Sequence, residues 1–383
     1  MTWIARACTF LVISCPCALV ISVPLGFFGG IGSASRIGVL IKGSNYLEQT
    51  ASLHTVVFNK TGTLTLGDFR VSEITPAGSK PHDLTCDDLH AADESVLELL
   101  RLAAHAEGYS THPIGASIRD AFEKEFHFSV SLDIVRDVEE LSGKGIRATI
   151  EDSVILAGNE KLMAEFGIEY TPATTVGTVI YLADQTREKY LGSLVISDTI
   201  KEDTAAALTD LRRAGVTQTV MLTGDHKVIA EKVASTVGID RVFAELLPAD
   251  KVDAVETLLA EEAPKETLAI VGDGINDAPV LVRSDVGIAM GSLGSDAAIE
   301  AANVVIMDDD LKKIGKVIRI ARKTVRIVKE NIVFALGVKL AILALGALGI
   351  AGMWAAVFAD VGVAILAILN SIRMLSYRGE YTV

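Results

Sequence analysis

Three short polar loops each follow an apolar segment and combine glycine with hydroxyl, amide or carboxylate side chains. They are Asn59-Lys60-Thr61-Gly62-Thr63, Thr223-Gly224-Asp225 and Gly272-Asp273-Gly274-Ile275-Asn276-Asp277. Small hydroxyls and backbone amides bind phosphate oxygens, and Asp273 with Asp277 offers the hard oxygen ligands that Mg²⁺ prefers. Lys251 adds a cation that can neutralise charge on a transferred phosphoryl group. Each loop alone is compatible with an ordinary polar turn, but together they predict a phosphoryl-transfer site.

This set of loops lacks the residue that would accept the phosphoryl group. The usual route to an aspartyl phosphate is attack by a carboxylate, whereas the apolar segment 55–58 delivers Asn59. An amide oxygen is far less nucleophilic than a carboxylate and gives no stable acyl phosphate. The loop therefore has the shape of a phosphorylation site without its nucleophile.

Alternating strands and helices must position these loops. Residues 190–198, 217–225 and 266–279 contain apolar strand-like segments, and helix-like segments separate them. This alternation predicts a parallel, Rossmann-like sheet with its site at the carboxyl ends of the strands. Since the strand before Asn59 joins the sheet from far upstream, residues 69–190 must form an inserted domain. Its helix-like and alternating segments predict an α+β module, so the fold class is α/β.

The loops resemble the catalytic core of P-type ATPases, whose signature here is Asp-Lys-Thr-Gly-Thr. Asn59 stands at the position that this family phosphorylates, so the resemblance implies a member with its nucleophile disabled. It implies ATP and Mg²⁺ as cofactors, with Mg²⁺ at Asp273 and Asp277. The catalytic positions that it implies are Asn59, Lys60, Thr61, Thr223, Gly224, Asp225 and Lys251.

The inserted segment contains residues that the heavy-metal branch of this family associates with nucleotide binding. They are Glu107, His112-Pro113, Gly143 and Gly145 in Ser142-Gly143-Lys144-Gly145, and Asn159. A histidine can stack on adenine or hydrogen-bond to it, and glycines let a backbone approach closely. An isolated His-Pro or Gly-x-Gly is more often a plain loop, so the prediction rests on their joint occurrence. Asp198 and Lys201 resemble a further element of the phosphorylation domain, for which a solvated helix cap is the alternative.

Two stretches are long and apolar enough to cross a bilayer, which takes about 20 residues. No charged residue occurs from 7 to 35, and only Lys339 and Asp360 are charged from 331 to 372. The second stretch predicts a helical hairpin that turns near residues 351–353. A basic segment precedes it, which places that end in the cytoplasm. Three spans in a plasma (inner) membrane result; a signal peptide is the weaker interpretation of the first stretch.

Cys15 and Cys17 flank Pro16 inside the first predicted span. Proline breaks the helix hydrogen-bond ladder and directs both thiols toward one point, and thiolates select ions such as Zn²⁺, Cd²⁺, Pb²⁺ or Cu⁺. The four cysteines, which include Cys8 and Cys86, imply no disulfide framework and a reducing compartment. A proline kink with incidental cysteines is the competing interpretation. The Cys-Pro-Cys motif resembles the transport site of heavy-metal pumps.

The two intramembrane charges bear on which metal is bound. At about 1.5 Å per residue, Lys339 and Asp360 lie roughly 10–12 Å from their own ends of the hairpin, so their depths differ by about 6 Å. Such charges usually pair. Mixed sulfur and oxygen ligands suit Zn²⁺, whereas Cu⁺ prefers sulfur. In the family, an Asp-x-Gly like Asp360-Val361-Gly362 with a preceding lysine accompanies the Zn/Cd/Pb class, which implies Zn²⁺ with Cd²⁺ and Pb²⁺. Lys339 is then a built-in counter-ion that helps to expel the metal.

The expected domain order follows from these segments. A transmembrane helix with a cytoplasmic extension (1–50) precedes a first segment of the phosphorylation domain (51–68). The nucleotide-binding domain (69–190) comes next, and the second segment of the phosphorylation domain (191–310) follows it. A basic cytoplasmic helix (311–330) then leads into the transmembrane hairpin (331–383).

Two other functions compete with an ATP-driven metal pump. A formal charge of −14 argues against nucleic acid as a partner; membrane lipid, ATP and a heavy-metal ion are the expected ones. A membrane-anchored phosphatase of the same superfamily would need a carboxylate where Thr61 stands. A non-catalytic nucleotide or metal sensor would explain Asn59. No Thr-Gly-Glu loop of an actuator domain occurs, so the chain resembles the C-terminal portion of a pump, truncated or working with its N-terminal half as a partner.

Overall fold

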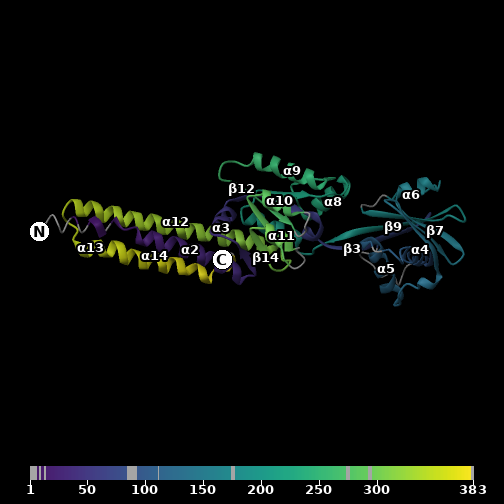
Figure 1. The fold of residues 1–383 in the computed structure, drawn as a ribbon, viewed down its shortest axis with the longest axis horizontal. Coiled ribbons are helices and arrows are strands. Elements are labelled where there is room, and N and C mark those ends of the chain that lie inside the picture. The colour runs from purple at the N-terminus through teal and green to yellow at the C-terminus, as the bar shows by residue number, and fades with distance from the viewer. Residues whose placement is uncertain are drawn as a thin grey trace. The chain divides into compact units, whose positions relative to one another are not determined.

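The computed structural model describes residues 7, 10–12, 14–83, 93–110, 112–173, 177–272, 277–291 and 296–380. The chain divides into two compact units, Met1–Leu64 with Glu202–Val383 and Thr65–Lys201 (Figure 1). Each unit has its own seven-stranded sheet. The predicted class, an α/β phosphorylation domain with an inserted α+β domain and three membrane helices, is confirmed.

The sheet of the first unit has the strand order β1-β14-β13-β12-β2-β10-β11. Its strands are β1 (Val39–Ile41), β2 (Leu53–Asn59), β10 (Gln218–Leu222), β11 (Arg241–Phe243), β12 (Thr267–Gly272), β13 (Val286–Met290) and β14 (Val304–Ile306). All neighbours are parallel except β1, which pairs antiparallel with β14. The upstream strand β2 lies between β12 and β10, so the loops after these three strands meet at one edge.

Helices join the parallel strands and bury both faces of this sheet. They are α3 (Ser44–Ala51), α7 (Thr204–Arg213), α8 (Lys227–Val237), α9 (Pro248–Glu261), α10 (Ala278–Arg283) and α11 (Asp296–Ala301). Val57 of β2 shares one core with Val255 and Leu258 of α9. Double-sided burial explains why β2 is a continuous apolar run and not an alternating one.

The second unit folds around an antiparallel sheet with the order β4-β3-β9-β8-β7-β6-β5. The strands are β3 (Thr65–Pro76), β4 (His82–Asp83), β5 (Val135–Leu141), β6 (Gly145–Ile150), β7 (Ser153–Gly158), β8 (Thr178–Asp184) and β9 (Lys189–Ile200), and the helices are α4 (Glu94–Ala106), α5 (Pro113–Phe126) and α6 (Glu160–Glu165). Leu100 of α4 and Phe122 of α5 pack with Ile155 and Leu194 of the sheet.

One strand assignment is corrected. Residues 190–198 were expected in the parallel sheet, but β9 pairs antiparallel with β3 and β8 in the second unit. The chain leaves the first unit through β3 and returns through β9, so the two crossing strands pair with each other. Buried apolar strands look alike in both kinds of sheet, which is why the sequence pattern does not separate them.

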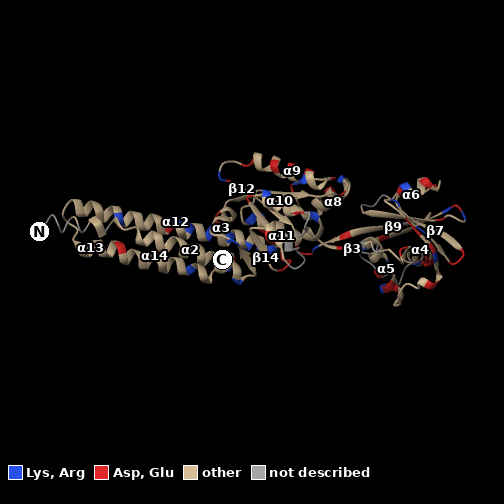
Figure 2. Cartoon of the chain, in the orientation of Figure 1, with Lys and Arg blue, Asp and Glu red and all other residues tan. Residues whose placement is uncertain are grey.

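Three candidate membrane spans occur in the described residues, Phe10–Arg36, Lys312–Ala347 and Met353–Ser376. The first contains α2 (Cys17–Arg36), the second is the single helix α12, and the third contains α13 (Met353–Val357), η5 (Phe358–Gly362), α14 (Val363–Ile372) and η6 (Arg373–Ser376). The predicted hairpin turn is present, since α12 ends at Ala347 and α13 begins at Met353. Helices α2, α12 and α14 contact one another, and charged residues on α12 gather in its first half, up to Glu330, whereas only Lys339 is charged after it (Figure 2).

Small residues bring these helices close together. A Cβ on Gly30 of α2 would overlap Thr324 Oγ1 of α12 and would lie 2.8 Å from Leu47 Cδ2. Thr324 is fully buried, and its hydroxyl donates to the Ile320 carbonyl at 2.8 Å, so it has little room to move. Glycine is therefore required by close helix contact at this position.

We expect Gly30→Ala to separate α2 from α12 and to destabilise the chain by about 1–3 kcal/mol. The matched control is Gly32→Ala in the same helix, where a Cβ would meet only Leu375 Cδ2 at 3.8 Å. The thermal unfolding midpoint of the detergent-solubilised chain should fall for the first variant and hold or rise for the second. Equal midpoints for the two variants would contradict this packing.

Candidate functional site

The carboxyl edge of the parallel sheet brings together two predicted catalytic residues, Asn59 and Lys251, and the predicted Mg²⁺ ligand Asp277. Asn59, at the end of β2, donates from Nδ2 to Asp277 Oδ2 at 2.6 Å. Lys251 donates from Nζ to Asn59 Oδ1 and to Asp277 Oδ1, both at 3.2 Å. Asp277 is 1% exposed, so its charge depends on these two partners.

A second ion pair lies in the same unit and joins two of the predicted loops. Lys60 Nζ lies 2.7 Å from Asp225 Oδ2, and the Lys60 side chain is 7% exposed. The Asp225 amide donates to Thr223 Oγ1 at 3.1 Å, which closes the Thr223-Gly224-Asp225 turn. The two loops are therefore held together by a largely desolvated lysine.

The loop after Asn59 has a conformation that its sequence dictates. Thr61 is extended (ψ 133°), and Gly62 has φ 74° and ψ −19°, a left-handed conformation that glycine adopts without steric cost. The next residue, Thr63, is fully buried, and in the described part of the chain its hydroxyl has no hydrogen-bond partner. Thr63 was not among the expected site residues, although it belongs to the same motif.

The predicted Mg²⁺ pair is described only in part. Asp273 lies outside the described residues, whereas Asp277 precedes α10 with its carboxylate beside Asn59. A buried carboxylate next to an amide is a donor set of hard oxygens and fits Mg²⁺. In this arrangement the Asn59 amide and Lys251 balance the Asp277 charge.

The predicted nucleotide residues all lie in the second unit. Glu107 follows α4 and is 6% exposed, and burial raises the pKa of its carboxyl above the ordinary range, against the opposing effects of Ser110, His112 and Arg119.

His112 caps α5: its Nδ1 accepts from the Ile114 amide at 3.2 Å, so Nε2 carries the proton of the neutral ring. Pro113 is the first residue of α5. Ser110 and Arg119 were not predicted, and Arg119 Nη1 donates to the Ser110 carbonyl at 3.0 Å.

The glycine loop contacts the start of α6, the helix that follows β7. A Cβ on Gly145 would overlap the Ala157 carbonyl oxygen, so the close approach of two strands requires this glycine. Asn159 donates from Nδ2 to the Gly143 carbonyl at 2.9 Å. Its Oδ1 accepts from the Lys161 amide at 3.1 Å, which makes it the N-cap of α6. Gly143, Gly145 and Asn159 thus form one local structure, and helix capping accounts for some of it.

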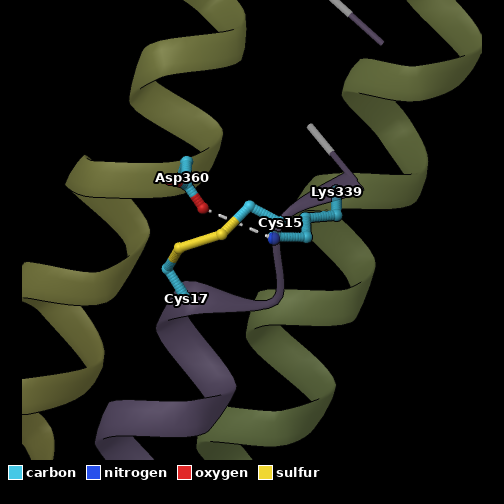
Figure 3. The surroundings of a disulfide bond; sticks show 4 residues. All are labelled: Cys15, Cys17, Lys339 and Asp360. Carbon is cyan, nitrogen blue, oxygen red and sulfur yellow. Dashed lines mark ion pairs between the residues drawn. A yellow bond between two sulfur atoms is a disulfide. The ribbon is translucent and has the colours of Figure 1, made fainter. Parts of the chain in front are cut away.

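The membrane bundle brings together the four residues expected to handle the metal (Figure 3). One ligand atom each from Cys15, Cys17 and Asp360 lies within 4.8 Å of the others. Lys339 Nζ lies 3.5 Å from Asp360 Oδ1, as the depth estimate predicted. Asp360 belongs to the π-helical segment η5, Phe358–Gly362, and such insertions within helices are frequent at functional sites.

The expectation of unbonded thiols is corrected. Cys15 and Cys17 form a disulfide across a Cα–Cα distance of 5.5 Å, within the range that a disulfide allows. Pro16 is the N-cap of α2, which begins at Cys17, and the two cysteine side chains meet beside Asp360 (Figure 3). Thiolates are the metal-binding form of cysteine, so this pair must be reduced before it binds a metal.

The parallel sheet with its loops defines a phosphoryl-transfer domain. The chain belongs to the haloacid dehalogenase-like hydrolase family, whose model matches residues 53–285. The predicted resemblance to heavy-metal P-type ATPases is also confirmed. The chain is 52% identical over 378 residues to the cadmium, zinc and cobalt-transporting ATPase of Bacillus subtilis, over 99% of this chain and 51% of that protein. It is 51% identical over 372 residues to the zinc-transporting ATPase of Synechocystis, over 97% and 49%.

Solved structures agree with this relationship. The crystal structure of a zinc-transporting PIB-type ATPase in the E2.Pi state matches with a TM-score of 0.80 at 36% identity, over 97% of this chain and 58% of that one. These relatives are membrane ATPases, so the expected membrane embedding of the chain and the cytoplasmic place of its catalytic domains are supported. The chain spans about half the length of the curated relatives that it matches.

The hydrogen bond from Asn59 to Asp277 predicts how an aspartate at position 59 would change the stability of the chain. Asn59→Asp would face Asp277 with a second carboxylate at 2.6 Å, and like charges so close oppose ionisation of both. We expect a loss of about 1–3 kcal/mol of stability without divalent cations, largely restored by Mg²⁺. Thermal unfolding with and without Mg²⁺ measures both effects.

The matched control is Asn45→Asp, an exposed position in α3, which should show no added Mg²⁺ dependence. An Asn59→Asp protein as stable as its parent in the absence of Mg²⁺ would show that the Asp277 charge is not balanced as described.

Proposed function

We propose that this chain is the catalytic and ion-translocating portion of an ATP-driven Zn²⁺ exporter. The observation that carries the proposal is the convergence of Cys15, Cys17 and Asp360 inside an apolar bundle, in a chain whose soluble sheet carries phosphoryl-transfer loops. The names of the Bacillus subtilis and Synechocystis relatives support zinc and cadmium as cargo. Pb²⁺ rests on thiolate chemistry and on the resemblance of Asp360-Val361-Gly362 to the Zn/Cd/Pb class.

Zn²⁺ binding in the membrane is assigned to the reduced Cys15 and Cys17 thiolates and the Asp360 carboxylate. Zn²⁺ accepts this mixture of sulfur and oxygen ligands. Among the described atoms, Lys339 Nζ and Asp360 Oδ1 are ion-paired but lack a hydrogen-bond partner, so the carboxylate can exchange the ammonium for the metal. When Zn²⁺ leaves, Lys339 compensates the Asp360 charge again, which lowers the cost of an empty site.

In the proposed phosphorylation site, Asp277 together with Asp273 would hold Mg²⁺. A Mg²⁺ ion bound there would neutralise the negative charge of the phosphate. Lys251 lies within 3.2 Å of Asn59 Oδ1 and is placed to pair with a phosphoryl group there. Lys60 orders the neighbouring Asp225 loop, and the Thr61 and Thr223 hydroxyls offer hydrogen bonds to phosphate. Asn59 itself provides no nucleophile, so we infer that this chain binds ATP and does not form a phosphoenzyme.

Nucleotide recognition is assigned to the second unit. His112 caps the helix through Nδ1, and its Nε2–H, on the opposite side of the ring, is assigned to the adenine. Glu107, whose pKa is raised by burial, and the Gly143–Gly145 loop are the other proposed contacts.

A second function is favoured by one observation, the amide at position 59. A membrane protein that binds nucleotide and metal without hydrolysing ATP would use all the remaining residues of the phosphorylation site and of the membrane metal site in the same way. Both functions predict ATP binding, and they differ in whether a carboxylate at position 59 restores chemistry.

We expect His112→Asn to weaken ATP binding about tenfold, since a stacked or hydrogen-bonded base contributes about 1–3 kcal/mol. Asparagine is a preferred N-cap, so this variant retains the start of α5 while it removes the imidazole. Calorimetric titration of the full chain with Mg²⁺-ATP measures the affinity, and an unchanged unfolding midpoint shows that the domain is intact. Equal affinity of parent and variant would remove His112 from the proposed nucleotide site.

A further inference from the structure

A second group of metal-ligating side chains lies at the opposite end of β2 from Asn59. His54 is the second residue of β2, and Glu262 and Glu266 lie between α9 and β12. One ligand atom from each of the three lies within 4.8 Å of the others. Because parallel strands carry the catalytic loops at their carboxyl ends, this amino-terminal cluster is separate from the phosphoryl-transfer site.

The two carboxylates lie beside different nitrogens of the His54 ring. His54 Nδ1 lies 3.2 Å from Glu262 Oε2, and His54 Nε2 lies 3.7 Å from Glu266 Oε1. Ligands at about 2.0–2.2 Å from a tetrahedral Zn²⁺ are separated by roughly 3.3–3.6 Å from one another. Glu266 is 37% exposed and accepts from the Ala263 amide through Oε2 at 3.2 Å, so one ion can be shared with Glu262 only if the Glu266 carboxylate turns toward Nδ1.

Glu262 provides independent support for a ligand. Its side chain is only 8% exposed, yet among the residues that the structure describes, its Oε2 atom accepts no hydrogen bond. Among the described residues its near neighbour is His54 Nδ1 at 3.2 Å, which compensates the carboxylate charge only when the imidazole is protonated. The atom faces the His54 ring, so a cation bound between them would satisfy it.

We propose that His54, Glu262 and Glu266 form a second site for a divalent metal ion, of the class of Zn²⁺. One imidazole nitrogen with two carboxylates is a ligand set that Zn²⁺ accepts, with water in the remaining position. The absence of sulfur from this set makes the site chemically distinct from the Cys15–Cys17 site. His54, at 33% exposure, and Glu266 leave a route for the ion to enter from solvent.

The position of the cluster indicates what occupancy would affect. Arg322 of α12 donates to the carbonyls of Ala51 and Leu53, at 3.0 and 3.3 Å, immediately before His54. The loop that carries both glutamates continues directly into β12, the neighbour of β2. A bound ion would therefore tie β2 to β12 beside the attachment of α12, a helix of the membrane bundle. Binding of an ion would therefore stabilise the pairing of β2 with β12 on the cytoplasmic side.

The alternative is a protonated His54 that bridges two carboxylates, one at each ring nitrogen. That arrangement needs no metal and would give the three residues no affinity for one. The two possibilities are therefore separated by direct metal binding and do not depend on transport or on ATP.

The test uses the full chain in detergent with Cys15→Ser and Cys17→Ser, which remove the thiolate ligands. Equilibrium dialysis with Zn²⁺ counts bound ions, and Co²⁺ absorption reports the ligand type, since no thiolate charge-transfer band should appear. We expect one bound ion in this background and a loss of affinity of at least about tenfold on adding His54→Ala. Glu266→Gln, a conservative change at a half-exposed residue, should weaken binding in the same direction.

His226→Ala is the matched control, because His226 also faces a glutamate at 3.2 Å but is 86% exposed. It should leave the metal count and affinity unchanged. Equal binding by the background, His54→Ala and Glu266→Gln proteins would overturn the proposal, and so would an absence of bound ion in the background protein. Unfolding midpoints within the range of the control exclude misfolding as the cause of a loss.

Discussion

A charge removed from water must be paired, and this constraint shapes both sites of the chain. At the sheet edge, the Asp277 carboxylate is balanced by Lys251 and by the Asn59 amide. In the bundle, Asp360 is balanced by Lys339. Removing one partner of a buried pair typically costs about 3–5 kcal/mol. Each pair therefore fixes its surroundings, and each can be opened at low cost only by a ligand that supplies equivalent charge.

The same constraint explains what an asparagine does at position 59. An amide donates a hydrogen bond to Asp277, which a carboxylate at the same place does only when it is protonated. With Asn59 in place, the Asp277 charge is balanced without a bound cation. The topology of β2, β10 and β12 still brings the three loops to one edge. The fold of a phosphorylation site and its chemistry are separable: the parallel sheet provides the first, and a single carboxylate would provide the second.

Much of this arrangement could be predicted from the sequence. The parallel sheet, the three spans and the Lys339–Asp360 pair follow from apolar runs, loop motifs and helix rise. The membership of β9 in the second sheet could not be predicted, because pairing is decided by tertiary contacts and not by local composition. Nor could the Cys15–Cys17 bond, since the same spacing serves a metal or a disulfide. Asn159 illustrates a third limit: its motif fits nucleotide binding, and the structure adds a helix-capping role.

In the proposed function, one atom type at position 59 separates a site that only binds ATP from one that reacts with it. The most direct measurement of this separation is incorporation of phosphate from γ-labelled ATP into the chain and into its Asn59→Asp variant, with and without Zn²⁺ under reducing conditions. We expect hydroxylamine-labile label only in the variant. Label in the chain with Asn59, or none in a variant that binds ATP and is folded in Mg²⁺, would contradict this role of the amide.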